Sequence, residues 1–113
     1  MYAKGHGVAQ DFAKAKAWFE KAAAQGERLG KAQFNLGVLY YEGLGVAQDF
    51  GKAKAWYEKA AAQGNIEAQF NLGVLYAHGQ GVEQDFGKAR AWYGKAADQG
   101  FAPAKEVLKN FPK

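Results

Sequence analysis

The chain has 113 residues, 49% hydrophobic and 23% charged, which is typical of one small folded domain or a short run of repeats. It contains no cysteine, which excludes a disulfide framework, a thiol nucleophile and a cysteine-ligated zinc site. The net charge of +4 is only mildly basic, and no apolar stretch approaches the roughly 18 residues of a membrane span.

A unit of 36 residues recurs along the chain. Residues 32–64 and 68–100 are identical at most positions, and residues 2–26 repeat the second part of the same unit. Repeats of this length are typical of stacked supersecondary units. The sequence therefore predicts a single domain over residues 1–113. It consists of a half repeat (2–26), two full repeats (28–64 and 66–100) and a C-terminal capping helix (102–110).

Each full unit is predicted to form two helices. In chain order, the expected helices span residues 11–25, 28–41, 49–63, 66–77, 85–99 and 102–110. The second helix of the unit is the clearer one, because apolar residues recur in it at steps of three and four. Asp49 is a good N-cap, and Gly64 is free to adopt the left-handed conformation that ends the helix.

Two glycines inside helices point to close packing. Gly37 and Gly73 occupy the same place in the two copies, where glycine costs about 1 kcal/mol relative to alanine. We expect another backbone to pass close to them, with Ala53 and Ala60 as the matching small surface. The recurring tryptophans are expected to pack between repeats, with an exposed aromatic ladder as the alternative; they are Trp18, Trp56 and Trp92.

The two ends of the chain differ in character. Pro103 suits a first helical turn, and the polar residues after it predict a cap. The helix expected over 11–25 lacks a preceding partner, so Phe12, Trp18 and Phe19 are expected to form an apolar edge. This predicts either a piece of a longer protein or a homodimer through that edge.

Three linked motifs carry a family resemblance. They are Ala-x-x-x-Leu-Gly-x-x-Tyr, then Gly-x-Gly-Val-x-x-Asp, then Ala-x-x-Trp-Tyr-x-Lys-Ala-Ala-x-Gln-Gly. This pattern resembles the Sel-one-like repeat (SLR) family, which is related to the tetratricopeptide repeats. The resemblance implies an all-α solenoid, with αα-hairpins stacked into a right-handed superhelix around a concave groove. It also implies a non-enzymatic adaptor or scaffold that binds a protein or peptide.

Similarity to the tetratricopeptide proteins places the groove on the second face of the first helices. The partner-binding residues expected there are Phe34, Asn35, Val38, Tyr41, Phe70, Asn71, Val74 and Ala77. The expected groove rim comprises Lys31, Glu42, Glu67 and His78. An apolar stripe with aromatic anchors and a polar rim suits the docking of a peptide. Two alternatives remain: the phenylalanines wedge between neighbouring helix pairs, and the asparagines bridge two helices by hydrogen bonds.

Other functions have weaker support in the sequence. Lysines recur along the second helices, which suggests nucleic-acid or anionic-surface binding by a convex face, although acidic residues interrupt the pattern. The Gly-x-Gly segments are expected to be turns and not phosphate cradles, and no metal or cofactor is predicted. Some Sel-one-like proteins have been linked to β-lactam hydrolysis, but this chain has neither serine nor cysteine as a nucleophile.

Two further points stay open at this stage. The near-identity of the copies also fits a consensus-like scaffold with no natural partner. The first residues lack the apolar core of a signal peptide. The cytoplasm is therefore the default compartment, and the periplasm or the exterior applies if the chain is a fragment.

Overall fold

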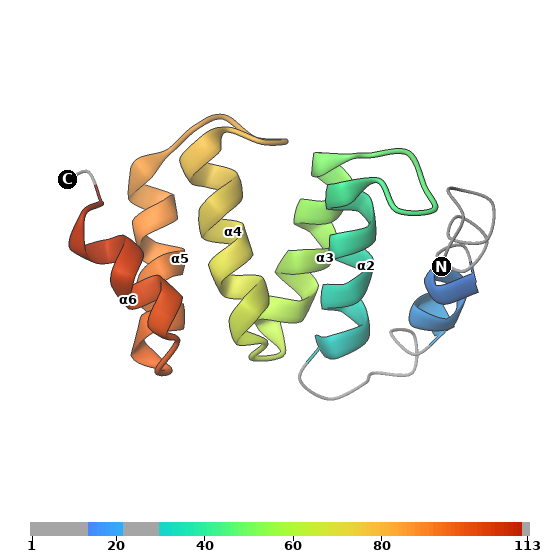
Figure 1. Ribbon diagram of the computed structural model, residues 1–113, viewed down its shortest axis with the longest axis horizontal. Coiled ribbons are helices and arrows are strands. Elements are labelled where there is room, and N and C mark those ends of the chain that lie inside the picture. Colours follow the sequence, from blue (N-terminus) through green and yellow to red (C-terminus); the bar gives the residue numbers. More distant parts are fainter. Residues whose placement is uncertain (1–13, 22–29, 112–113) are drawn as a thin grey trace, which may run out of the picture.

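The structure, a computed structural model, describes residues 14–21 and 30–111 (Figure 1). Residues 14–21 are helical. The helices that follow are α2 (Lys31–Glu42), α3 (Phe50–Ala62), α4 (Ile66–His78), α5 (Phe86–Asp98) and α6 (Ala102–Lys109). Within these described ranges there is no strand. The predicted all-α fold is confirmed, and where both ends are described the predicted and observed helix ends differ by no more than one residue.

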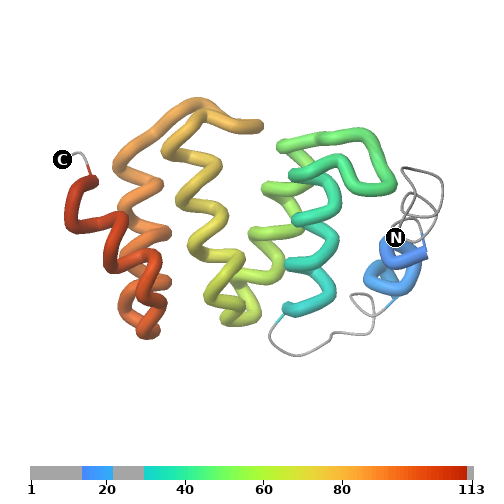
Figure 2. The backbone as a smooth tube through the Cα atoms, in the orientation of Figure 1, coloured from blue at the N-terminus to red at the C-terminus, as the bar shows by residue number. Residues whose placement is uncertain are grey.

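The helices form hairpins that stack along one direction. Helices α2 and α3 pack as one antiparallel hairpin and α4 and α5 as the next, with α3 against α4 and α6 against α5 (Figures 1 and 2). This arrangement is an α-solenoid, in which each hairpin contacts only its neighbours. Within the part of the chain that the structure describes, no helix has the length and apolar character needed to cross a bilayer.

Short polar side chains fix where the helices begin. The Asp49 carboxylate accepts a hydrogen bond from the backbone amide of Lys52 at 3.0 Å, as the sequence predicts for an N-cap. Asn65 caps α4 in the same way through the amide of Ala68 at 2.8 Å. After α3 the chain passes through Gly64 with a φ of 92°, the left-handed conformation expected at this stop.

The core of each hairpin is a tyrosine ring that fits against a glycine. A Cβ atom on Gly37 would lie 2.5 Å from two ring carbons of Tyr57, and one on Gly73 would lie 2.7 Å from the ring of Tyr93. The predicted close contact is therefore confirmed, but the predicted neighbour is wrong, because a ring and not a backbone fills the space. The backbone approach occurs at Gly30, where an added Cβ would lie 2.7 Å from the Cα of Ala60.

The C-terminal end is closed by α6 and Phe111. The Phe111 ring lies 5.7 Å from the ring of Phe86 and 5.3 Å from that of Tyr93. On α6, Lys105, Glu106 and Lys109 are exposed. The outer surface of this last helix is therefore polar, as a solenoid cap requires.

Part of the expected N-terminal edge is visible. Trp18 is 68% exposed and Phe19 is half-buried. Phe12 lies outside the described residues, as does the predicted start of the first full repeat at 28. The two residues aligned with Trp18 are less exposed: Trp56 is half-buried, and Trp92 packs against a cluster of buried residues from α3 and α4.

Candidate functional site

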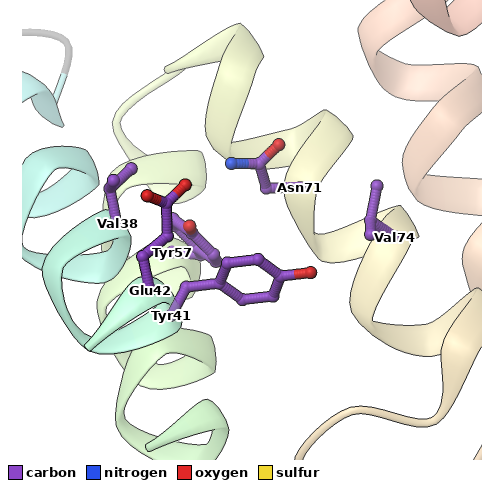
Figure 3. A pocket seen from close by; sticks show the side chains of 6 residues that line it. All are labelled: Val38, Tyr41, Glu42, Tyr57, Asn71 and Val74. Atoms are coloured by element: carbon purple, nitrogen blue, oxygen red, sulfur yellow. The ribbon is translucent and has the colours of Figure 1, made fainter. Parts of the chain in front are cut away.

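A pocket of about 200 Å³ lies where α2, α3 and α4 meet (Figure 3). Its lining residues are Val38, Tyr41, Glu42, Tyr57, Asn71 and Val74. We call it the central pocket. Four of the predicted partner-binding residues and one predicted rim residue are brought together here. Tyr57 was missed, because its place on the second helix gave no sign that it would reach this pocket.

Tyr41 forms a fixed wall of the central pocket. Its ring extends from α2 into the space between α2 and α4 (Figure 3). It lies 5.1 Å from the ring of Phe50. Its hydroxyl donates a hydrogen bond to Oε1 of Gln80 at 2.9 Å, in the loop after α4. The ring is therefore fixed by its packing on Phe50 and by its hydrogen bond to Gln80, and this bond links one repeat to the next.

The floor of the pocket is a hydrogen-bonded pair across two repeats. Tyr57, on α3, is 1% exposed, and its side chain is hydrogen-bonded to that of Asn71 on α4. Burial raises the pKa of Tyr57 to about 12, and the bond to Asn71 partly opposes that rise. The bond supports the interpretation that Asn71 bridges two helices.

The aligned positions show that this pair is specific to the central joint. Asn35 aligns with Asn71, but the residue aligned with Tyr57 in the half repeat is Phe19, which has no hydroxyl. At the other end Tyr93 faces a repeat in which Val107 stands in the place of the asparagine. The signal in the sequence is that only the central joint has both the tyrosine and the asparagine at the aligned positions.

Stability is expected to fall in alkali as Tyr57 ionises. The Tyr57 phenol has a pKa near 10 in the unfolded chain and about 12 in the folded protein. The neutral phenol therefore makes its full contribution to stability below pH 10. This contribution is then lost as the pH rises through 12. The difference corresponds to roughly 2 to 3 kcal/mol of unfolding free energy. Urea unfolding at pH 8 and pH 11.5 measures the loss.

Tyr57→Phe is the control for this alkaline effect. It removes the titrating group and should lose clearly less stability between the two pH values. Burial also raises the pKa of Tyr93, which contributes equally in both proteins. An identical pH dependence of the wild type and Tyr57→Phe would contradict the assignment.

The two predicted phenylalanine anchors are packing residues. Phe34 lies 5.7 Å from the ring of Tyr57, and Phe70 lies 5.2 Å from Tyr93 and 5.3 Å from Phe101. Both are half-buried, and neither lines the central pocket. The ring contact of Phe34 lies within its own hairpin, whereas Phe70 also reaches Phe101 in the following unit. The alternative of a wedge between neighbouring helix pairs therefore fits Phe70.

Other predicted groove residues lie away from the central pocket. Ala77 is only 8% exposed and packs with Ala89 and Tyr93, so its expected place on the groove surface is corrected to the core. Its small side chain lets these helices approach closely. Lys31 and Glu67 line a second, wider hollow of about 440 Å³ beside Phe101. His78 is exposed in the last turn of α4.

Among residues 14–21 and 30–111, no three His, Cys, Asp or Glu side chains gather in a way that could hold a metal ion. The two Gly-x-Gly segments that the structure describes, 43–45 and 79–81, are turns, as expected, because Gly43 and Gly79 end their helices with φ of 70° and 67°. The first segment, 5–7, lies outside the described residues.

Comparisons with known proteins agree with this architecture. The chain resembles a protective antigen of uropathogenic Escherichia coli with an SLR fold, at 42% identity and a TM-score of 0.82 over 86% of this chain and 20% of that one. It also resembles a Sel1 repeat protein from Oxalobacter formigenes, at 39% identity and a TM-score of 0.75 over 81% and 36% of the two chains.

The third comparison covers most of a smaller protein. Cysteine-rich protein B of Helicobacter pylori is 26% identical, with a TM-score of 0.77 over 83% of this chain and 69% of that one. This chain therefore spans only about a fifth and a third of the first two relatives. No curated protein matches it. The Sel1 repeat family matches at residues 1–27, 30–65 and 66–101, and the chain belongs to that family.

Proposed function

We propose that the chain binds a protein segment in the central pocket, as a module of a protein-interaction scaffold. Sel1 repeat proteins are generally scaffolds of this kind and are typically non-catalytic. The observation that carries the proposal is the pocket itself, where Val38 and Val74 provide apolar surface beside the fixed ring of Tyr41. A guest side chain buried there gains hydrophobic stabilisation without first ordering the protein.

Polar groups around the pocket define the guest further. Asn71 has one carbonyl and two N–H groups, so its bond to Tyr57 leaves hydrogen-bonding capacity for a guest backbone. Glu42 is exposed at the same pocket and pairs with none of the described cations. A carboxylate there repels an acidic guest and attracts a basic one. The preferred segment thus carries an apolar side chain next to a lysine or arginine.

A peptide panel tests this proposal. Immobilised 12-residue peptides would carry one Leu, Val or Phe beside either Lys or Glu, and the affinities of those that bind would follow from fluorescence anisotropy. We expect the Lys-containing peptides to bind more tightly than their Glu counterparts. Val38→Ala with Val74→Ala should weaken binding about tenfold, because methyl groups that contact the guest are lost.

Two controls make the test decisive. Val82→Ala lies in a loop outside the pocket and should change affinity less than twofold while circular dichroism shows unchanged helicity. Glu42→Gln should abolish the preference for Lys over Glu. Equal affinity of the wild type and the Val38/Val74 variant, or no binding by any peptide, would overturn the proposal and favour a scaffold without a partner at this pocket.

A further inference from the structure

A second surface recurs on an exposed face of the second helices, which we call the outer face. Each second helix carries a lysine, a tryptophan and a lysine at positions i, i+4 and i+7, which places all three on one helix face. We call each set an outer triad. The triads are Lys14–Trp18–Lys21, Lys52–Trp56–Lys59 and Lys88–Trp92–Lys95. Every lysine in them is exposed.

Aromatic rings hold the triad lysines in place in both full repeats. Lys59 Nζ lies 4.7 Å from the centroid of the Trp56 ring, and Lys95 Nζ lies 5.3 Å from that of Trp92. The other lysine of each triad sits over a tyrosine of the first helix, Lys52 at 5.5 Å from Tyr40 and Lys88 at 5.6 Å from Tyr76. Attraction between the ammonium and the ring restricts these otherwise mobile side chains.

The triad charges are not neutralised by acidic neighbours. Among the described residues, the ion pairs are Lys16–Glu20, Lys54–Glu58 and Lys109–Glu106, and none uses a triad lysine. Glu58, the acid on α3 beside the first full triad, is engaged by Lys54 at 2.8 Å. The outer face therefore presents a row of fixed positive charges.

In the second full repeat the triad surrounds a shallow hollow. Its volume is about 420 Å³, and it is lined by Tyr76, Lys88, Ala91, Trp92 and Lys95. The floor is aromatic and aliphatic, with one ammonium toward each end. Seven residues of helix separate the two lysines, which is roughly 10.5 Å along the axis.

We propose that this hollow binds an acidic amphipathic protein segment. An apolar side chain of the segment covers Ala91, Trp92 and Tyr76, and carboxylates on either side of it meet Lys88 and Lys95. A helical guest with acids at i and i+7 has the matching separation. The hollow shares no residue with the central pocket, so this proposal stands independently of the first.

The observations favour an acidic protein over a nucleic acid. A sugar–phosphate backbone offers little apolar surface to cover the aromatic and aliphatic floor of the hollow. An apolar side chain flanked by carboxylates matches both the apolar floor of the hollow and its two lysines.

A labelled helical peptide is the probe. The peptide is alanine-rich, with Glu at positions 4 and 11 and Leu at positions 7 and 8, and its binding to the intact chain is followed by fluorescence anisotropy in 50 mM salt. We expect binding that weakens when both Glu are changed to Gln, when both Leu are changed to Ala, or in 200 mM salt.

A charge-matched pair of variants separates this hollow from net charge. Lys88→Gln with Lys95→Gln should weaken binding about five- to tenfold, the loss expected for two surface charge pairs. Lys105→Gln with Lys109→Gln on α6 changes the net charge equally and should have less than a twofold effect. Equal effects of the two pairs, or no binding of the peptide, would overturn the proposal. It would also be overturned if a 20-nucleotide single-stranded DNA or phosphatidylserine vesicles bound more tightly through Lys88 and Lys95.

Discussion

Tyr57→Ala is expected to lower the free energy of unfolding by about 3–5 kcal/mol, the cost of emptying a buried aromatic site. The Tyr57 ring fills the space beside Gly37, stacks near Phe34 and is hydrogen-bonded to Asn71. Its removal leaves a cavity at the joint between the two full repeats. Because small domains are stable by only about 5–15 kcal/mol, the loss should be plain in urea unfolding followed by circular dichroism.

Trp18→Ala is the matched control for the loss of a large aromatic side chain. Trp18 is 68% exposed, so its removal should change the unfolding free energy by no more than about 0.5 kcal/mol. Tyr57→Phe keeps the ring and should lose only about 1 kcal/mol through the missing hydrogen bond. A loss below about 1 kcal/mol for Tyr57→Ala would contradict the packing described for this joint.

Gly37→Ala is expected to destabilise the fold, whereas Gly94→Ala is expected to stabilise it. Both glycines lie within helices, where alanine is intrinsically favoured by about 1 kcal/mol. At Gly37 the new Cβ would collide with the Tyr57 ring at 2.5 Å, and overpacking of this kind costs typically about 1–3 kcal/mol. At Gly94 nothing lies within 4 Å, so only the helical preference acts.

Thermal unfolding of the two variants measures this difference in sign. The melting temperature should fall for Gly37→Ala and rise for Gly94→Ala, relative to the wild type. The double variant Gly37→Ala with Tyr57→Leu should lose less than the sum of its single changes, because the smaller side chain vacates the space. A melting temperature raised by Gly37→Ala would show that the ring moves aside without cost.

The repeat pattern was enough to predict the helices and their ends. The three- and four-residue periodicity located α3 and α5, and Asp49 and Gly64 fixed the limits of α3 through elementary backbone chemistry. The neighbour of Gly37 could not be predicted in this way. A helical wheel shows which face is buried, but not which side chain of another helix projects into the gap between them.

The candidate site was predicted only in part for the same reason. Val38, Tyr41 and Val74, which their spacing puts on one face of the first helices, line the same pocket. Their role as partner-binding residues stays a prediction. Ala77 was misplaced, because its alignment with Tyr41 concealed that its smaller side chain lets α4 and α5 close over it. The outer hollow was also missed, because lysines and tryptophans were considered as separate ladders, although Lys95 follows Trp92 by three residues on the same helix. The contact of Lys88 with Tyr76 joins two helices and depends on tertiary geometry.

The bond between Tyr57 and Asn71 bears on how nearly identical units find their correct order while the chain folds. If the helix at 14–21 docked on α4 in place of α3, Phe19 would face Asn71, and the amide would lose its hydroxyl partner. One such bond is worth about 1 kcal/mol, which favours the correct order roughly fivefold. A single hydroxyl oxygen thus distinguishes two helices of similar sequence and disfavours a misfolded arrangement in which one repeat is skipped.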